Sequence, residues 1–431
     1  MTVDRRTFLK AAGSALAAPI AASLPATVRA QAPVEIVIWQ WIPKFSDQVD
    51  LFNKSQNRIR VVSAPVTNSA DQSLKLRNAL AAHSGGPDIA MLEYAHLPAL
   101  NTVNAFLDIS QEVADVRGQF VNGAISQCVV NGKTLGLPLD VAPMIQMYRA
   151  DILGEWGINP PATWDEFAAA AEKVRSKSNS QYLTNMFLTS AGWTTGMIWQ
   201  RGARGFEIDG ENISINLNGA PSKAFSDYWQ RLIDAKLVGT EPDSTADFFM
   251  ALDSGRYLQI MAGCWFPNYA RTNANKSFGK WRVAKMPHLT PQNTLSTAFG
   301  GSMFGVFSGT KHPKESLEVI KYMMSNRAPT ELYVREQFLT PSTRKLISDP
   351  SIRDIEQPMC GNQKVNEVNF AAIEEMTVPY RFSPFEDYVQ QVMNDELPQA
   401  GKGARTLSQA FGRIQDRVVA YAKDQGFTVR A

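Results

Sequence analysis

Histidine and cysteine are scarce in this chain of 431 residues. The four histidines are His83, His96, His288 and His312. No two of them have the spacing of metal ligands, and no H-E-x-x-H motif occurs. The three cysteines are Cys128, Cys264 and Cys360. Their wide separation excludes a C-x-x-C redox motif and a zinc ribbon. We therefore expect no metal site and no cofactor, and the sequence leaves open whether two cysteines form a disulfide.

Motifs of the common enzyme classes are also missing. The chain has no G-x-S-x-G elbow and no G-x-G-x-x-G after a strand. Gly132-Lys133-Thr134 resembles the end of a phosphate loop, but Gln127 stands where the leading glycine belongs. A glycoside hydrolase needs only two carboxylates, and a sequence does not reveal their pairing. We therefore predict no catalytic residue, with a secreted carbohydrate-active enzyme as the alternative.

Long apolar runs are absent, since none reaches the roughly 20 residues of a membrane span. The first 30 residues instead have the order of an export signal. A basic stretch at 4–10 precedes an apolar run at 11–24, and Val28-Arg29-Ala30 supplies a small-residue cleavage site. The Arg5-Arg6 pair followed by Phe-Leu-Lys resembles a twin-arginine signal. The sequence thus predicts export to the periplasm and cleavage near Ala30.

The charge balance changes when this segment is removed. Residues 1–30 hold four basic residues and one acidic residue, so the formal net charge goes from +2 to −1. A nearly neutral mature chain gives no electrostatic reason to expect nucleic acid or an anionic membrane as partner. We expect a monomer.

Hydrophobic patterning predicts an α/β fold. Strands are expected at 34–41, 59–66 and 88–92, with helices at 47–54 and 70–82 between them and Ser69 as the cap of the second helix. Such alternation is typical of a parallel sheet with helices on both faces. Ligands bind at the carboxyl ends of such strands. The residues at that edge are Trp39, Gln40, Trp41, Glu93 and Tyr94.

The rest of the chain also has patterns that predict turns, helices and strands. Asn131-Gly132 predicts a tight turn, and Thr163 with Glu166 predicts a capping box that opens a helix to about Lys177. Further helices are expected at 223–237, 314–325 and 406–423, and strands at 183–188 and 257–262. The length favours two domains of about 100–200 residues each. Because no linker composition separates them, we expect lobes joined by several chain crossings.

Tryptophan is abundant, with nine residues. Trp193 follows Gly192 directly and Trp265 follows Gly263-Cys264, and a glycine just before a tryptophan favours an exposed loop position over a core position. Flat aromatic faces stack on the C–H faces of sugars, while polar neighbours bond their hydroxyls. The sequence therefore indicates a binding site for a carbohydrate, although each tryptophan has core packing as its alternative role.

Several segments, in order, resemble one family. They are Gly132–Asp140 (GKTLGLPLD) with 147–151, Gly157–Phe167 (GINPPATWDEF), Phe248–Trp265, and Phe299–Ser302 (FGGS) with 311–313. Together they are similar to the extracellular, periplasmic solute-binding proteins of carbohydrate ABC importers, the group that includes maltose-binding protein. Arg149 stands where that family usually has asparagine, and Arg256-Tyr257 also depart from its pattern.

The resemblance implies a two-lobe clamshell, each lobe a mostly parallel sheet flanked by helices, with a ligand cleft between. It implies a ligand-binding set of Trp39, Gln40, Trp41, Glu93, Tyr94, Asp140, Trp193, Trp265, Gly300, Gly301, Ser302 and Arg381. The implied function is capture of a sugar or sugar derivative by cleft closure and delivery to inner-membrane ABC permease subunits. A polyol or an anionic derivative stays open, since Arg381 can pair with a charged group.

Crossings between the lobes are expected at 137–142, 296–301 and 339–342, where glycine or proline interrupts strand-like segments. The N-terminal lobe is then predicted at 31–140 plus 298–341. The C-terminal lobe is predicted at 141–297 plus 342–431.

Overall fold

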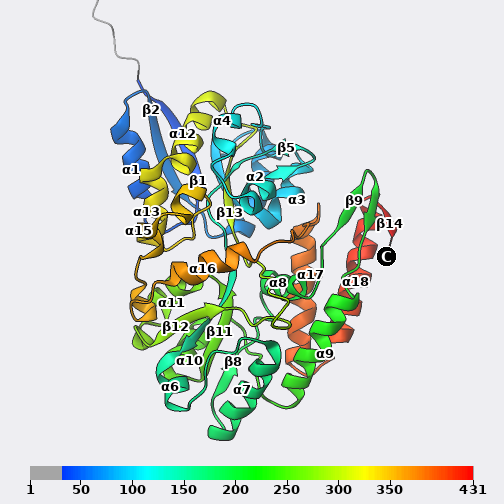
Figure 1. The fold of residues 1–431 in the computed structure, drawn as a ribbon. Helices are drawn as coiled ribbons and strands as arrows, with labels where there is room; N and C mark the ends of the chain where they lie inside the picture. The colour runs from blue at the N-terminus through cyan, green and yellow to red at the C-terminus, as the bar shows by residue number, and fades with distance from the viewer. Residues whose placement is uncertain (1–31, 431) are drawn as a thin grey trace, which may run out of the picture.

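The computed structural model describes residues 32–430, which form two α/β bodies (Figure 1). The predicted export signal at 1–30 lies outside the described residues. We name the body around the five-stranded sheet the N-terminal lobe and the body around the four-stranded sheet the C-terminal lobe. Each has its own large hydrophobic core. Within 32–430, no helix has the length and apolar character needed to cross a membrane.

The N-terminal lobe has the strand order β2-β1-β3-β13-β6. The strands are β1 (Val34–Gln40), β2 (Ile59–Pro65), β3 (Ile89–Glu93), β6 (Leu137–Pro138) and β13 (Ser302–Val306). Strand β1 pairs in parallel with β2 and β3, whereas β13 runs antiparallel to β3 and β6. The helices of this region are α1 (Ser46–Ser55), α2 (Ser69–Ala82), α3 (Leu97–Asn101), α4 (Ala114–Arg117), α5 (Asn122–Ile125), α12 (Pro313–Ser325) and α13 (Arg327–Gln337). The hairpin β4 (Val129–Val130) and β5 (Lys133–Thr134) completes it.

The C-terminal lobe has the strand order β12-β7-β11-β8. The strands are β7 (Met144–Arg149), β8 (Tyr182–Thr184), β11 (Tyr257–Gly263) and β12 (Trp281–Lys285). The helices around it are α6 (Ala150–Glu155), α7 (Trp164–Lys177), α8 (Ala191–Gln200), α9 (Ala220–Asp234), α10 (Ala246–Ser254), α11 (Phe266–Asn273), α16 (Val365–Glu374), α17 (Glu386–Gly401) and α18 (Leu407–Asp424). A small sheet of β9 (Glu207–Asp209), β10 (Asn212–Ser214) and β14 (Thr428–Arg430) lies beside α18 (Figure 1). Two short helices, α14 (Arg344–Ile347) and α15 (Pro350–Arg353), precede α16.

Hydrogen bonds between distant segments hold the lobes together where the chain passes from one to the other. Val141 N donates to Thr340 O at 3.1 Å, and Met144 N donates to Thr297 O at 2.7 Å. Isolated bridges join Asp140 to Pro341 and Pro143 to Ala298. Three stretches far apart in sequence therefore lie side by side here.

The predicted α/β class is confirmed, and the early strands and helices lie within a residue or two of their predicted bounds. The expectation of mostly parallel sheets is wrong for the C-terminal lobe, because β7 runs antiparallel to both β11 and β12. Strand β7 enters directly from the other lobe, so no crossover helix forces it to run parallel. The predicted cap of α2 is also wrong by one residue. The Asn68 side chain accepts from Asp71 N, and Ser69 is already helical.

Candidate functional site

A cavity of about 230 Å³ lies between the two lobes. From the N-terminal lobe it is lined by Glu93, Ala95 and Gln127. From the C-terminal lobe and the crossing it is lined by Thr189, Ser190, Ala191, Gly192, Thr195, Trp199, Ala298, Phe299, Gly300, Phe382, Gln390 and Asn394. The volume is a little below the roughly 300–1,000 Å³ of typical small-molecule sites, so this conformation suits a small solute.

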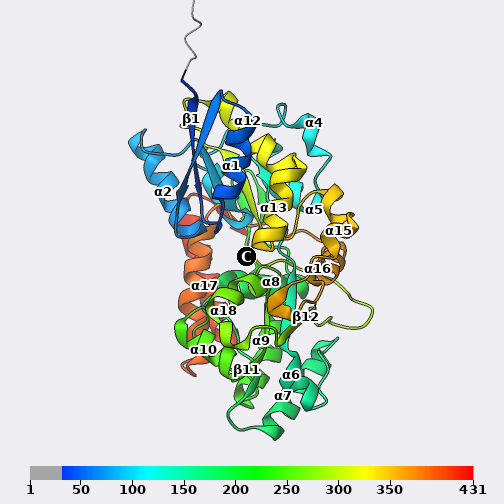
Figure 2. The same ribbon diagram turned by 90° about the vertical axis from the view of Figure 1, so that its left-hand side faces the viewer.

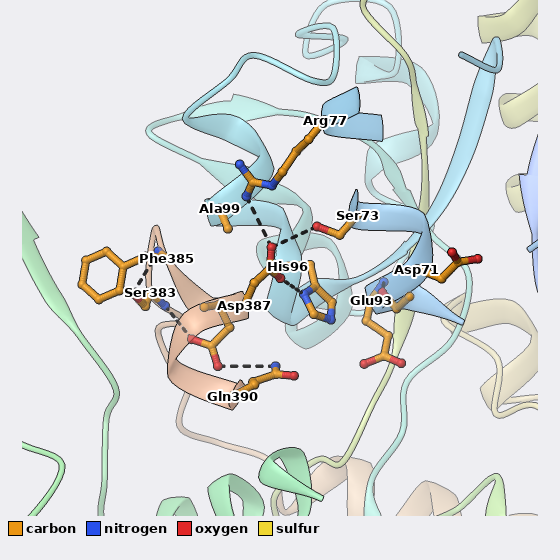
Figure 3. Close-up of polar contacts among 12 residues, drawn as sticks. Asp71, Ser73, Arg77, Glu93, His96, Ala99, Ser383, Phe385, Asp387 and Gln390 are labelled. Carbon is orange, nitrogen blue, oxygen red and sulfur yellow. Dashed lines mark hydrogen bonds and ion pairs between the residues drawn. The ribbon is translucent and has the colours of Figure 1, made fainter. Parts of the chain in front are cut away.

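Glu93 reaches the cavity because it ends β3. The strand is buried along its length, and the carboxyl end of a strand in such a sheet is where ligands bind. The Glu93 side chain has no hydrogen-bond partner among residues 32–430, and in Figure 3 it points away from the ionic contacts around His96. The backbone of Glu93 is fixed, in contrast, because its N–H donates to Ser69 Oγ at 3.2 Å. The strand thus fixes the backbone and leaves the carboxyl group available.

Two glycines shape the crossing beside Glu93. Gly300 and Gly301 have φ values of 93° and 95°, a region that residues with a side chain rarely adopt. A Cβ on Gly301 would lie 2.9 Å from the Tyr94 ring. A Cβ on Gly300 would lie 3.2 Å from the Trp265 indole nitrogen. Glycine is therefore required here for the chain to pass closely between two aromatic side chains.

The lining combines hydrogen-bonding groups with aromatic faces. Gln390 and Asn394 contribute amides, and Asn394 Oδ1 accepts from Ala191 N at 2.8 Å. The hydroxyls of Thr189 and Ser190 donate to the two oxygens of Asp243, at 2.5 and 2.9 Å. The aromatic contributors are Trp199, Phe299 and Phe382. Within the described residues, the lining has no lysine, arginine or histidine.

Carboxyl groups dominate the electrostatics of this region. Burial raises the pKa of Glu93, and the nearby His96 opposes that shift. Burial also raises the pKa of Asp140 to about 7, although a hydrogen bond from Ser302 N opposes the shift. Burial raises the pKa of Glu386 to about 7 as well, again against a backbone hydrogen bond, from Ser383. Three carboxyl groups with raised pKa values therefore lie in or near the site, and the charge of Asp140 and of Glu386 depends on pH near neutrality.

Of the residues predicted to bind ligand, Glu93 and Gly300 line the cavity. Trp39, Gln40 and Trp41 do not, because they turn toward their own lobe. The two indoles are half-buried against the N-terminal core. Gln40 is 4% exposed, and its Nε2 donates to Ser63 Oγ on the neighbouring strand at 2.9 Å. The Gln40 side chain therefore joins β1 to β2, and the two indoles pack on the N-terminal core.

Trp193 is a correction to the sequence prediction. It lies in α8 rather than in a loop, and it has no exposed surface. Its Nε1 donates to Met261 O at 2.8 Å, and its ring packs edge-on against Trp229. The glycine before it, Gly192, lies in the first turn of α8. It is a glycine because that turn passes close to the Phe299 ring. Trp193 therefore belongs to the core of the C-terminal lobe.

Four more predicted residues support the crossing that carries Phe299 and Gly300. The Trp265 Nε1 donates to Phe299 O at 2.9 Å. Tyr94 Oη donates to Asp140 O at 2.9 Å, and Asp140 Oδ1 accepts from Ser302 N at 2.8 Å. Each of these contacts fixes backbone beside the cavity.

Arg381 and Gly301 complete the predicted set. The Arg381 side chain is exposed and lies outside the lining, while its backbone pairs with the segment around Gly205. The residue after it, Phe382, does line the cavity. Gly301 lies next to the lining residue Gly300, and its carbonyl accepts from Tyr94 N at 3.1 Å.

Sequence reasoning missed most of the C-terminal wall. Trp199, Gln390 and Asn394 lie on helices whose apolar faces pack inward. The spacing of Gln390 and Asn394, four residues apart beside the buried Val389 and Met393, is a helical signal. It places both amides on one face, but it does not show what that face meets.

Two α/β lobes with crossing chain segments and a cavity between them define a two-lobed binding protein. A sequence model of the bacterial extracellular solute-binding proteins matches residues 47–356 of the chain. Because this match covers well over half of its length, the chain belongs to that family. The family resemblance inferred from sequence motifs is confirmed, and with it a binding role in place of a catalytic one.

Named relatives have low identity over long stretches. The chain is similar to a lactose-binding protein of Rhizobium radiobacter, with 24% identity over 301 residues, 66% of this chain and 69% of the relative. It is also similar to the arabinooligosaccharide-binding protein of Bacillus subtilis, with 22% identity over 293 residues, 66% of this chain and 64% of the relative.

Solved structures match nearly the whole chain. One is the ABC transporter-associated binding protein of B. animalis subsp. lactis Bl-04 in complex with β-1,6-galactobiose. It has a TM-score of 0.83 and 28% identity, and the match covers 93% of this chain and 100% of that one. Another is the galacto-N-biose/lacto-N-biose I-binding protein of Bifidobacterium longum in complex with lacto-N-biose. Its TM-score is 0.82 at 25% identity, with the same coverage.

Proposed function

We propose that this protein is the solute receptor of an ABC importer and that it binds a small neutral sugar in the cavity between its lobes. The observation that carries the proposal is the cavity lining, where amides, hydroxyls and one carboxylate alternate with aromatic rings. Such a surface suits a solute with many hydroxyls and apolar C–H faces. The relatives support the sugar class, since their names and bound ligands are lactose, β-1,6-galactobiose and lacto-N-biose.

The charge of the lining favours a neutral sugar over an anionic derivative. Among the described residues, Glu93 is the one ionisable residue that lines the cavity, and no basic residue lines it. Arg381, which sequence reasoning offered to an anionic group, lies outside the lining. An anion would meet the field of Glu93 with no compensating cation, which costs affinity.

The same residue argues against a glycoside hydrolase. Hydrolases of that kind place two carboxyl groups on either side of the bond they cleave. The lining of this cavity contains the carboxyl group of Glu93 and no second one within residues 32–430. A carboxylate without a catalytic partner accepts hydroxyl hydrogen bonds and holds the sugar in one orientation.

Capture is proposed to proceed by hinge closure, in which the crossings at 137–142, 296–301 and 339–342 bend and the lobes enclose the solute. The lobe boundaries at 31–140 plus 298–341 and 141–297 plus 342–431 are part of the proposal. The proposed contact residues are Glu93 and Gly300 together with Gln127, Thr195, Trp199, Phe299, Phe382, Gln390 and Asn394. The closed form is then recognised by the permease subunits.

The proposed location of the protein rests on its family and on its first 30 residues. The family is extracellular. We propose that the twin-arginine-type segment at 1–30 directs the protein to the periplasm and is removed near Ala30. Amino-terminal sequencing of the periplasmic protein is expected to begin near Gln31.

Calorimetric titration tests the solute class. We expect heat of binding with β-1,6-galactobiose, lacto-N-biose or lactose and none with glucose 6-phosphate as the anionic comparison. The bound sugars should also raise the melting temperature, because a ligand that binds the folded state stabilises it. Chromatography of the sugars after long incubation should show no product. Tight binding of the phosphate ester, or cleavage of a disaccharide, would contradict the proposal.

A further inference from the structure

Helix α17 belongs to the core of one lobe but its first turn touches the other. Val389, Val392 and Leu397 are buried in the C-terminal core. Asp387, in the first turn, instead contacts side chains of the N-terminal lobe. The end of α17 that carries Asp387 contacts α3, which lies above it in Figure 1, and it lies below α2 in Figure 2. This end of α17 therefore bridges the two lobes beside the cavity.

The Asp387 carboxylate receives several donors from the N-terminal lobe (Figure 3). Its Oδ1 lies 2.5 Å from His96 Nδ1. Its Oδ2 accepts from Ser73 Oγ at 3.1 Å and from Arg77 Nη2 at 3.4 Å. His96 is 3% exposed and comes directly after β3, three residues beyond Glu93. A separation of the lobes would break all of these contacts.

The helix connects this contact to the cavity. Asp387, Gln390 and Asn394 follow the i, i+3, i+7 spacing of one helix face. Gln390 and Asn394 line the cavity. The position of Asp387 against the N-terminal lobe therefore sets how far these two amides reach toward the opposite wall.

The groups that face His96 are mostly anionic. They are Glu93 on β3 and Glu386 and Asp387 on α17, with Arg77 on α2 bound to the same carboxylate. Burial by itself lowers the pKa of His96. The hydrogen bond to Asp387 and the charges of the three carboxylates outweigh it, so the pKa of His96 lies above its ordinary value. The same contact holds the pKa of Asp387 below its ordinary value, against the effect of burial.

We propose that Asp387 is a positioning residue and that its contact with His96 is a proton-linked latch, which forms when the lobes close and sets Gln390 and Asn394 against the solute. The proposal rests on the proposed function, in which closure captures the solute. Asp387 is not among the lining residues of the cavity, so its effect on the solute is expected to pass through α17.

The direction of the pH effect follows from linkage. In the open form His96 loses its anionic partner on α17, so its proton is held less tightly than in the closed form. Closure therefore takes up a proton and is favoured by mild acid. The latch contributes fully below the open-form pKa of His96 and is lost as pH rises through the higher closed-form pKa. Each pKa unit between the two forms changes the closure equilibrium tenfold.

Distances between spin labels test the latch without any solute. Cysteines placed at Lys54 on α1 and Lys177 on α7 are exposed and lie in different lobes, whereas the three native cysteines are buried. Pulsed electron spin resonance should show shorter distances at about pH 5.5 than at about pH 8.5, which bracket the ordinary pKa of histidine. H96Q and D387N should abolish most of this response. D395N is the matched control, because Asp395 lies on the same helix and pairs with Arg417 within the C-terminal lobe.

The outcomes separate the latch from the solute class. Distances that do not respond to pH in the parent protein overturn the latch, and so does a D387N response equal to that of the parent. Neither result bears on the calorimetric titration with β-1,6-galactobiose, so failure of the sugar proposal is seen there alone. If galactobiose binds, its affinity should fall from acid to alkaline pH in the parent but not in D387N. The fall should be about tenfold for each pKa unit between the open and closed forms of His96.

Discussion

The two walls of the cavity differ in chemistry and in origin. The N-terminal wall is short and is made by the end of β3, the turn after it and Gln127, with Glu93 as its charged group. The C-terminal wall is longer and comes from two helices, and it brings Trp199, Gln390 and Asn394. The N-terminal wall supplies a single charged hydrogen-bond acceptor. The C-terminal wall supplies apolar contact area and several neutral hydrogen-bonding groups.

We propose that the two walls contribute differently to binding, with directional hydrogen bonding from the N-terminal wall and contact area from the C-terminal wall. A carboxylate accepts strong, charge-assisted hydrogen bonds and so selects which hydroxyls of a solute face it. Aromatic faces and amides contribute contact area that tolerates variation in the solute. The following changes test this division, from the largest expected effect to the smallest.

Trp193→Ala should have the largest effect, and the effect should be on stability. Trp193 is fully buried behind the C-terminal wall and packs against Trp229. Removing a buried tryptophan costs about 3–5 kcal/mol of the free energy of unfolding because a cavity remains. Chemical denaturation measures it. The matched control is Phe382→Ala, since Phe382 is half-buried at the wall and its loss should change unfolding less. Equal losses in the two variants would contradict the division between core and wall.

Glu93→Gln should have the largest effect on solute affinity. It keeps the size of the side chain but removes the charge from the N-terminal wall. Hydrogen bonds to a charged group contribute about 1.5–3 kcal/mol, so affinity for a bound sugar should fall by roughly ten- to a hundredfold. Calorimetry of parent and variant measures this loss. Gln127→Ala on the same wall removes a neutral amide and should cost less. Unchanged affinity in Glu93→Gln would assign orientation to the C-terminal wall.

The Asp140 carboxyl group should make stability depend on pH. Its folded-state pKa of about 7 lies above the ordinary value of 3.8 for an aspartate, because the group is buried. Its contribution is therefore fully present below the unfolded-state pKa and is lost as pH rises through about 7. The free energy of unfolding should fall by at least about 1 kcal/mol between about pH 5 and about pH 8. Asp140→Asn should flatten that part of the profile, and an unaltered slope would contradict the assignment.

Arg381→Ala should have the smallest effect. The side chain is exposed and outside the cavity lining. Exposed substitutions usually change stability by less than about 0.5 kcal/mol, and affinity for a neutral sugar should stay the same. Calorimetry checks this directly. A large loss of affinity would restore Arg381 to the site and reopen the anionic class of solute.

Much of the fold followed from local pattern. Strand β1 alternates between buried and less buried residues, and helix α18 has a clear apolar face that includes Leu407, Phe411 and Ile414. Local pattern did not show the direction of β7, because strand direction depends on a partner more than 100 residues away in β11 and β12. It also placed Trp193 in a loop, since a glycine at the start of a helix looks the same in sequence as a glycine in a turn.

The candidate site was less accessible to sequence reasoning. Glu93 was predicted because it ends a strand, and Gly300 was predicted from the family resemblance, and both line the cavity. The C-terminal wall left only the helical spacing of Gln390 and Asn394, because Thr189, Trp199 and Asn394 meet only after α8 and α17 have packed together. Tryptophans were chosen as candidates from their residue type alone. Whether each one lies in the core or at the wall depends on tertiary contacts, which a local pattern does not show.

Strand β13 has a consequence for how the protein is synthesised. It lies between β3 and β6, yet its residues 302–306 follow the whole β7–β12 segment in the chain. While the ribosome makes residues 141–301, the edge of β3 lacks its neighbour, and an unpaired strand edge is prone to association with other chains. A fragment ending at 140 should therefore aggregate instead of folding as a lobe. The first lobe to begin cannot be completed until most of the second has been made.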